Sequence, residues 1–319
     1  MQRRRRTQRM GAITVVVVAL GLVAGFAPPA RATNDPKWKD QYGPVQIQAH
    51  AAWTKTKGER VIVAVVDTGV DYDHPDLKAK LLPGRDFASN DNNADDDAKD
   101  DIGVRGHGTH VAGIAAATRG NGHGVAGVAP DAQLLVAKVL DSEGEGTSDD
   151  ITAGVKWVLS KGADVVNLSL GDAGIGGVGV LCSNSGFKAL LNEIWDAGAI
   201  PVFAAGDGGG GVLGGGANFA NTNALIVGAT TIQGNKTSYT NDLYSAQWGL
   251  VAPGGEPSCD HGLKQDNPCI FSTFWDPNRN VASDAYAYMA GTSMAAPHVS
   301  GAAAVLLAQQ MSKQQAVER

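Results

Sequence analysis

Five short apolar runs rich in valine, isoleucine and leucine recur along the chain, separated by longer segments of mixed composition. They span residues 61–66, 134–139, 165–170, 200–205 and 224–229. Continuous apolar runs of this length are typical of strands that are buried on both faces of a parallel sheet. Helices are predicted between them, at residues 110–117, 149–161 and 187–197. The alternation predicts an α/β fold, a three-layer, doubly wound and mostly parallel sheet.

Three polar residues lie at the ends of these predicted elements, where open α/β sheets bind their ligands. Asp67 is the first residue after the run 61–66, in the stretch DTGVDYDHPDL. His107 lies in GHGTH before an alanine-rich helix, and Ser293 lies in GTSMAAPH at the start of another. Singly, each has a structural interpretation, because an Asp can cap a turn, a His can pack and a Ser can begin a helix. Together they supply the carboxylate, base and alcohol of nucleophilic acyl transfer.

The order Asp, His, Ser and the stretches around these residues, DTGVDYDHPDL, GHGTHVAGIAA and GTSMAAPHVSG, resemble the subtilisin-like serine proteases. The resemblance runs from Asn34 to the last residue. It implies a subtilisin-like fold and a secreted serine endopeptidase that cleaves polypeptides through an acyl-enzyme, with a broad or apolar preference. Asp67 would orient the base, His107 would act as general base and then acid, and Ser293 would be the nucleophile. His110 and His298 are expected to be structural.

The resemblance also assigns the substrate cleft. The segment Ser169–Leu170–Gly171 matches the family's edge strand, which pairs with an extended peptide through main-chain hydrogen bonds. Ala204, Ala205 and Gly206 would line the opposite wall of the pocket for the side chain that precedes the scissile bond. Small residues there leave room for a large apolar group.

Asp207 departs from the family pattern. The strand that reads FAAG here is normally followed by Asn, whose amide donates a hydrogen bond to the oxyanion. An ionised carboxylate has no donor and repels the developing charge, so turnover is expected to fall. The backbone amide of Ser293 would remain as a donor, and a protonated Asp207 could donate through its hydroxyl. One branch of the related proprotein convertases carries Asp at this place and is enzymatic. Asn218 could supply an amide instead.

Two classes of function follow. The first is an active endopeptidase, for which Asp207 predicts an acidic optimum. The second is a catalytically impaired relative that binds peptide in its cleft, or a truncated fragment. A lipase or esterase of the α/β-hydrolase type is excluded, because no G-x-S-x-G elbow surrounds Ser293 and the order of the triad differs.

The lead-in NDPKWKDQYGPVQIQAHAAW resembles the thermitase-like branch of the family and implies bound calcium. By this resemblance the first site takes side chains of Asp35, Asp76 and Asn121, and main-chain carbonyls of Thr118, His123 and Val125. Hard oxygen ligands from separate loops suit Ca²⁺, which accepts six to eight of them. Loss of the ion would loosen the N-terminus.

A second candidate calcium loop is the acidic stretch 86–101. A run of so many carboxylates is commonly just solvated, and this interpretation stays open. Its alternation of Asp and Asn also resembles a thermitase calcium loop. By that match the ligands would be Asp86, Asp91, Asn93 and Asp95.

Residues 1–32 have the layout of a secretory signal peptide: a basic start, an apolar run at 11–26 and the small-x-small site Ala30-Arg31-Ala32. The alternative is a membrane anchor, but the run is short of the roughly 20 residues that span a bilayer. Residues 33–319 are then one catalytic domain, secreted and expected to be a monomer without stable membrane association. They leave no room for a folding propeptide, and the family would continue beyond Arg319.

The net charge and the cysteines limit the classes of binding partner and the cellular compartment that we expect. Removal of residues 1–32 takes away six arginines and no acidic residue, which lowers the net charge from −6 to −12. Such an acidic protein is not expected to bind nucleic acid. Cys259 and Cys269 are close enough in sequence to close a small loop, leaving Cys182 unpaired, as suits an oxidising compartment. Three reduced cysteines are the alternative.

Overall fold

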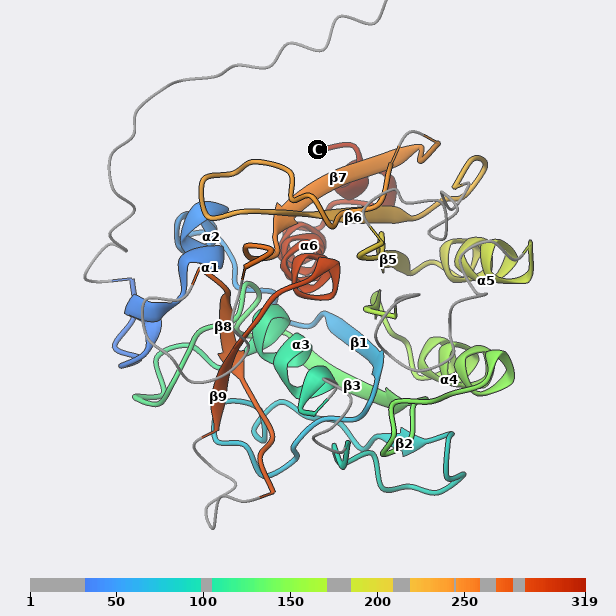
Figure 1. The fold of residues 1–319 in the computed structure, drawn as a ribbon, viewed down its shortest axis with the longest axis horizontal. Helices are drawn as coiled ribbons and strands as arrows, with labels where there is room; N and C mark the ends of the chain where they lie inside the picture. Colours follow the sequence, from blue (N-terminus) through green and yellow to red (C-terminus); the bar gives the residue numbers. More distant parts are fainter. Residues whose placement is uncertain are drawn as a thin grey trace, which may run out of the picture.

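The computed structural model describes residues 32–98, 105–170, 185–208, 219–243, 245–258, 268–277 and 285–319. Its centre is a seven-stranded sheet in the order β2-β3-β1-β4-β5-β6-β7, in which every pairing is parallel (Figure 1). The strands are β1 (Ile62–Asp67), β2 (Arg85–Asp86), β3 (Gln133–Lys138), β4 (Val165–Leu168), β5 (Ile200–Ala204), β6 (Leu225–Thr230) and β7 (Trp248–Pro253). All five predicted strands are present, so the predicted parallel α/β sheet is confirmed.

Helices cover both faces of this sheet and complete the three layers. On one face α3 (His107–Ala116) packs against α6 (Thr292–Ala308), and on the other lie α4 (Ser148–Ser160) and α5 (Ser185–Asp196) (Figure 1). Along β1 the side chains alternate between the two layers, as the pleat requires. Val63 and Val65 join the apolar core beside α3 and α6, whereas Ala64 and Val66 join the core beside α4 and α5.

Several elements were not predicted from the apolar runs. β2 has two residues, and β7 alternates partly buried and exposed positions along its first four residues. Strands β8 (Ile270–Thr273) and β9 (Tyr286–Met289) form an antiparallel hairpin outside the main sheet. The short helices are η1 (Trp38–Asp40), α1 (Tyr42–Gln46), α2 (Ala49–Ala52) and α7 (Lys313–Val317).

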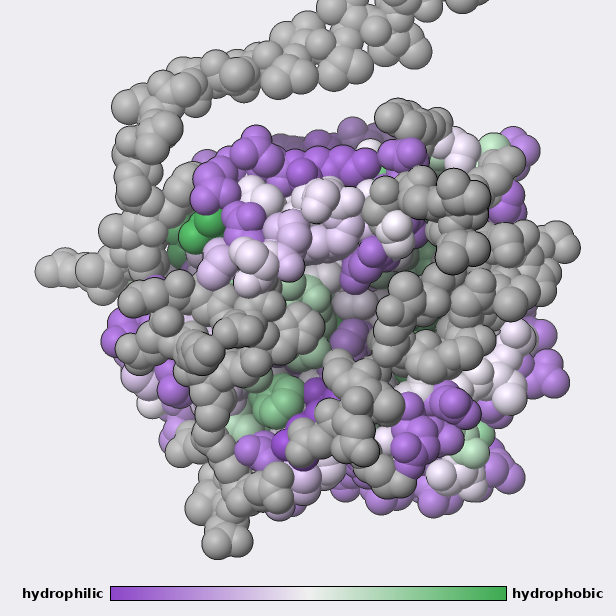
Figure 2. Space-filling view, viewed as in Figure 1, coloured by the Kyte–Doolittle hydropathy of each residue, from purple (hydrophilic) through white to green (hydrophobic). Residues whose placement is uncertain are grey.

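The surface of the described residues is largely polar. Val251 is the one large apolar side chain among them that is exposed. On the face seen in Figure 2, hydrophobic colour is limited to small areas of the coloured surface. Within the same described ranges, the helices are too short or too polar to cross a membrane.

Candidate active site

The predicted carboxylate and base meet where a strand ends and a helix begins. Asp67 is the last residue of β1, and His107 is the first residue of α3. The Nδ1 atom of His107 lies 2.7 Å from Oδ1 of Asp67, and the two residues are 4% and 0% exposed. The amide of Thr68 donates a second hydrogen bond, of 2.8 Å, to the same carboxylate oxygen. The geometry is that of a base oriented by a buried carboxylate.

Electrostatics favour the charged form of His107. Burial lowers the pKa of this histidine, but the charge and hydrogen bond of Asp67 raise it, as do the charges of Asp96 and Asp207. The net result is a pKa above the ordinary value for histidine. The surrounding carboxylates therefore stabilise the imidazolium form of His107.

Ser293 is the second residue of α6 and is partly exposed. Its hydroxyl donates to the carbonyl of Ser169 at 3.3 Å, and the Ser169 hydroxyl donates to the carbonyl of Ser293 at 2.9 Å. The Ser169 hydroxyl also accepts a hydrogen bond from the amide of Asn167 (2.9 Å), whose carbonyl oxygen accepts one from Ser300 (2.8 Å). A chain of polar side chains thus fixes the turn that carries the predicted nucleophile.

Asp207 lies at the N-terminus of the same helix. One carboxylate oxygen, Oδ1, accepts the amide of Thr292 at 2.9 Å. The other, Oδ2, is so close to Gly291 that a Cβ atom there would lie 2.8 Å from it. The Thr292 hydroxyl in turn accepts the amide of Gly206 at 3.1 Å. A carboxylate therefore lies at the positive end of α6, next to the turn that leads into Ser293.

The predicted substrate walls are well ordered by their neighbours. Ala204 and Ala205 are buried, and Leu170 packs into the core beside α4 and α5. Asn241 holds the turn after β5, because its side-chain amide donates to the carbonyl of Ala205 and its main-chain amide to that of Gly206, both at 3.0 Å. Gly171 and Asn218 lie outside the described residues.

The first predicted calcium set converges on the loop after α3. The Asp35 carboxylate accepts the amides of Gly120 and Gly122. Asp76 accepts the side-chain amide of Asn121 at 2.8 Å and the main-chain amide of Val125 at 2.9 Å. The hydroxyl oxygen of Thr118 is buried there without a hydrogen bond. This oxygen-rich donor set of two carboxylates, an amide and loop carbonyls fits Ca²⁺.

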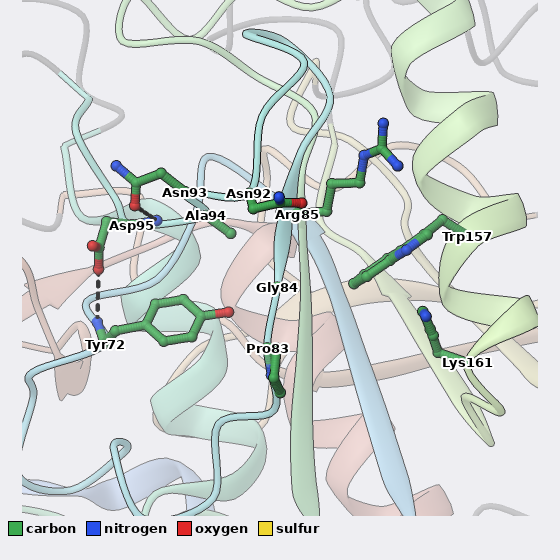
Figure 3. Close-up of a pocket in the computed structure, with 10 residues that line it drawn as sticks. All are labelled: Tyr72, Pro83, Gly84, Arg85, Asn92, Asn93, Ala94, Asp95, Trp157 and Lys161. Atoms are coloured by element: carbon green, nitrogen blue, oxygen red, sulfur yellow. Dashed lines mark hydrogen bonds between the residues drawn. The ribbon is translucent and has the colours of Figure 1, made fainter.

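Three of the four residues of the second predicted set accept amides of their own loop, and the fourth accepts an amide of another segment. Asp86 accepts the amide of Ser89, Asp91 that of Asn93, and Asn93 that of Asp95, while Asp95 accepts the amide of Tyr72 at 3.1 Å. Figure 3 shows the last two of these bonds beside an open cavity of about 560 Å³, which Trp157 and Lys161 line from the opposite side. Among the described residues, no group of three acidic, histidine or cysteine side chains has an arrangement that could hold a metal.

Two histidines and one cysteine have structural roles. The Nε2 atom of His110 contacts the carbonyls of Ile270 and Ala287 in the β8–β9 hairpin. His298 bonds to the carbonyl of Met294, and burial lowers its pKa to about 4. Cys269 is disulfide-bonded, whereas Cys182 and Cys259 lie outside the described residues.

The burial of Lys138 and Asp96 beside the Asp67–His107 pair was not predicted from the sequence. Lys138 is 1% exposed, lies opposite Asp67 in the pairing of β1 with β3, and donates to the carbonyls of Thr68 and Leu140 at 2.7 Å each. The one sequence feature that indicates a buried lysine is its position as the single charged residue in the apolar run 134–139. Asp96 is also 1% exposed, and burial raises its pKa to about 7, opposed by a hydrogen bond from Thr109 and the charge of Lys138. Because Asp96 lies in a run of acidic residues, which is commonly solvated, the sequence did not predict that it is buried.

An Asp–His pair lies at the carboxyl end of a parallel sheet and a serine at the start of a central helix, an arrangement that suits a serine-type endopeptidase. Residues 58–318 match the model of the subtilase family of peptidases, and the chain belongs to that family.

Two relatives and one solved structure are similar to this chain over most of its length. Thermitase of Thermoactinomyces vulgaris is 38% identical over 86% of this chain and 85% of its own length. An intracellular serine protease of Paenibacillus polymyxa is also 38% identical, over 83% of this chain and 72% of its own. A protease structure from Pseudoalteromonas arctica PAMC 21717 superposes with a TM-score of 0.71 at 32% identity, covering 90% of this chain and 91% of that one. These matches agree with the resemblance to the thermitase-like branch.

Proposed function

We propose that the chain hydrolyses peptide bonds through a triad of Asp67, His107 and Ser293. The observation that carries the proposal is the buried 2.7 Å hydrogen bond between Asp67 and His107 Nδ1. It leaves Nε2 of the imidazole as the atom that would take a proton. Ser293, at the start of α6, is the alcohol of the set.

The reaction would run in two halves. The Ser293 oxygen attacks the carbonyl carbon of the substrate while its proton passes to His107 Nε2, and the carbonyl oxygen becomes an oxyanion. His107 then gives that proton to the leaving amine, which leaves an acyl-enzyme on Ser293. Water, deprotonated by His107, hydrolyses the ester and returns the serine. Asp67 keeps the imidazole oriented and stabilises its positive charge throughout.

The oxyanion would be stabilised by the main-chain amide of Ser293 at the positive end of α6. Asp207 supports a second candidate function, that of a peptide-binding protein with impaired catalysis. Its ionised carboxylate already occupies the Thr292 amide and would repel the oxyanion. Catalysis would therefore require the protonated form of Asp207, so an active enzyme should prefer acidic pH.

Substrates would be polypeptides, with a broad or apolar preference at the pocket walled by Ala204, Ala205 and Gly206. Export by residues 1–32 would place the domain 33–319 outside the cell as a monomer, without nucleic acid or membrane partners. Named relatives include both extracellular and intracellular proteases. The disulfide at Cys269 supports an oxidising compartment.

Calcium would brace the N-terminus in this proposal. The residues that would hold the ion are Asp35, Asp76 and Asn121, with carbonyls of Thr118, His123 and Val125. The ion would supply charge neutralisation between the lead-in and the loop after α3, and it would take no part in the reaction. The second set, Asp86, Asp91, Asn93 and Asp95, stays a weaker proposal because its oxygens bond to their own loop.

A fluorophosphonate probe and casein separate the two functions. An endopeptidase should be labelled at Ser293 and should cleave casein, and both signals should vanish in Ser293→Ala and in His107→Ala. Circular dichroism of each variant verifies that the fold is retained. A folded wild-type protein that is neither labelled nor active would refute the triad and support the peptide-binding function.

A further inference from the structure

The acidic loop before α3 places its side chains alternately outside and inside the protein. Asp95 lines the open cavity of Figure 3, Asp96 is buried, and the side chain of Asp97 is 57% exposed. Ala94 and Ala98 are also buried, so buried and exposed residues alternate along 94–98. The alternation of an extended segment thus directs one carboxylate inward, toward the Asp67–His107 pair.

Two threonine hydroxyls join the segment that follows Asp67 to the helix that begins with His107. Thr68, directly after Asp67, accepts the main-chain amide of Gly108 on its hydroxyl at 3.1 Å. Thr109, two residues after His107, accepts the main-chain amide of Asp71 at 3.0 Å. Each segment therefore donates an amide to a hydroxyl of the other, so the two hydrogen bonds are reciprocal.

Asp96 accepts from both of these hydroxyls. The Thr109 hydroxyl donates to Oδ2 of Asp96 at 2.9 Å, and the Thr68 hydroxyl donates to Oδ1 at 3.4 Å. Above its raised pKa of about 7, Asp96 is an ionised carboxylate, which only accepts hydrogen bonds, so it directs the hydrogen of each hydroxyl toward itself. The lone pairs of the hydroxyls are then free to accept the amides of Gly108 and Asp71.

A buried cation completes the cluster. Lys138 donates to the carbonyl of Thr68 and lies 2.8 Å from a carboxylate oxygen of Asp97. Its charge compensates the carboxylates that face the pair from β1 and from the acidic loop. Thr68, the residue after Asp67, is therefore held at its carbonyl oxygen by Lys138 and at its hydroxyl by Asp96.

We propose that Asp96 is a positioning residue for the Asp67–His107 pair, acting through Thr68 and Thr109. The inference rests on the proposed triad. Replacement of Asp96 by Asn would bring a donor, Nδ2, against one of the two hydroxyls. The hydrogen of that hydroxyl would lose its acceptor and the hydroxyl would have to rotate, which changes its geometry toward the amide that it accepts and lets the two segments shift relative to each other.

The test compares four variants with the wild type. Asp96→Asn changes the central acceptor, Thr109→Val removes one hydroxyl, and Thr109→Ser restores it. Asp164→Asn is the matched control, because Asp164 accepts the amide of Ile62 at 2.8 Å and so holds the opposite end of β1. The first two variants should lower kcat roughly 10- to 100-fold, with KM within about twofold, as misplacement of reacting groups does. Thr109→Ser should be close to wild type.

A pH profile separates positioning from a structural role. His107 faces the carboxylates of Asp67, Asp96 and Asp207. Asp96 is charged above its raised pKa of about 7, and removal of that charge in Asp96→Asn should move the acid limb of kcat/KM to lower pH. Asp164→Asn should lower the melting temperature without moving the limb. The proposal is overturned if folded Asp96→Asn and Thr109→Val keep the wild-type kcat and limb, or if Asp164→Asn loses as much kcat as they do.

A second readout does not depend on catalysis. In the Ser293→Ala background, the His107 imidazole can be titrated by NMR with and without Asp96→Asn and Thr109→Val. A displaced titration and an altered Nδ1 proton resonance would support positioning even if the wild type cleaves no peptide, which would instead refute the proposed function. An unchanged histidine spectrum would overturn the inference.

Discussion

Replacement of Asp207 by Asn should make the enzyme faster and slightly less stable. An Asn side chain can keep Oδ1 on the amide of Thr292, where Asp207 accepts at 2.9 Å. Its Nδ2 atom then takes the place of Oδ2, next to Gly291 and Ser293. A repelling oxygen is thereby exchanged for a donor at the place where the oxyanion would form.

The two effects have opposite signs and can be estimated separately. One side-chain donor at an oxyanion is worth about 10²–10³ in kcat, a figure measured in a subtilisin. Loss of the charge at the start of α6 costs about 0.3–1 kcal/mol of stability, which is roughly 1–3 °C in melting temperature for a domain of this size. Turnover should therefore rise by up to about 10²–10³ while the melting temperature falls.

The pH profile gives an independent measure. His107 must be neutral to act as a base, Asp207 must be protonated to donate, and an ionised Asp207 raises the pKa of His107. Activity should therefore be limited at low pH by protonation of His107 and at higher pH by ionisation of Asp207. Asp207→Asn should move the acid limb of kcat/KM to lower pH and remove the decline toward neutral pH that a protonated donor imposes. Asp207→Ala is the control, because it removes the charge without adding a donor. If the Asn variant is no faster than the Ala variant at any pH, the oxyanion role of residue 207 is wrong.

Three further predictions follow from other contacts. Chelation of calcium should lower the melting temperature, and Asp76→Asn should abolish that response; an unchanged melting temperature after chelation would remove structural calcium from the proposal. His298 is buried with a pKa of about 4, below its unfolded value, so the stability that it contributes is present above about pH 6.5 and lost as pH falls toward 4. Melting temperatures across that range should fall less steeply in His298→Gln. Gly108→Ala should abolish casein cleavage or folding, because an added Cβ would lie 2.1 Å from the carbonyl oxygen of Gly69, and a fully active variant would contradict the packing described around Asp67.

The sequence predicted the fold best where a local residue pattern is compatible with one kind of structure. The valine-rich runs predicted the buried strands because few other structures bury continuous apolar segments. Asp67 was predicted because it follows such a run, and His107 and Ser293 because each precedes an alanine-rich helical segment. The burial of Asp96 could not be predicted from the sequence. It depends on which residues of the loop point inward, and on Thr109 and Thr68, which lie 13 and 28 residues away along the chain. The same holds for β7 and the β8–β9 hairpin, whose partners are set by tertiary packing.

Among the described residues, the hydrogen bonds given above around the proposed triad fall into two groups with no side chain in common. Asp67 and His107 are held by Thr68, Asp96 and Thr109, whereas Ser293 is held by Ser169, Asn167 and Ser300. The proposed base and the proposed nucleophile therefore belong to separately held parts of the site, joined through the pairing of β1 with β4 and the packing of α3 on α6. Such a protein could lose its nucleophile alignment by local opening of one part while the histidine stays oriented. Partial inactivation by mild denaturant, with the His107–Asp67 bond intact, would then precede unfolding.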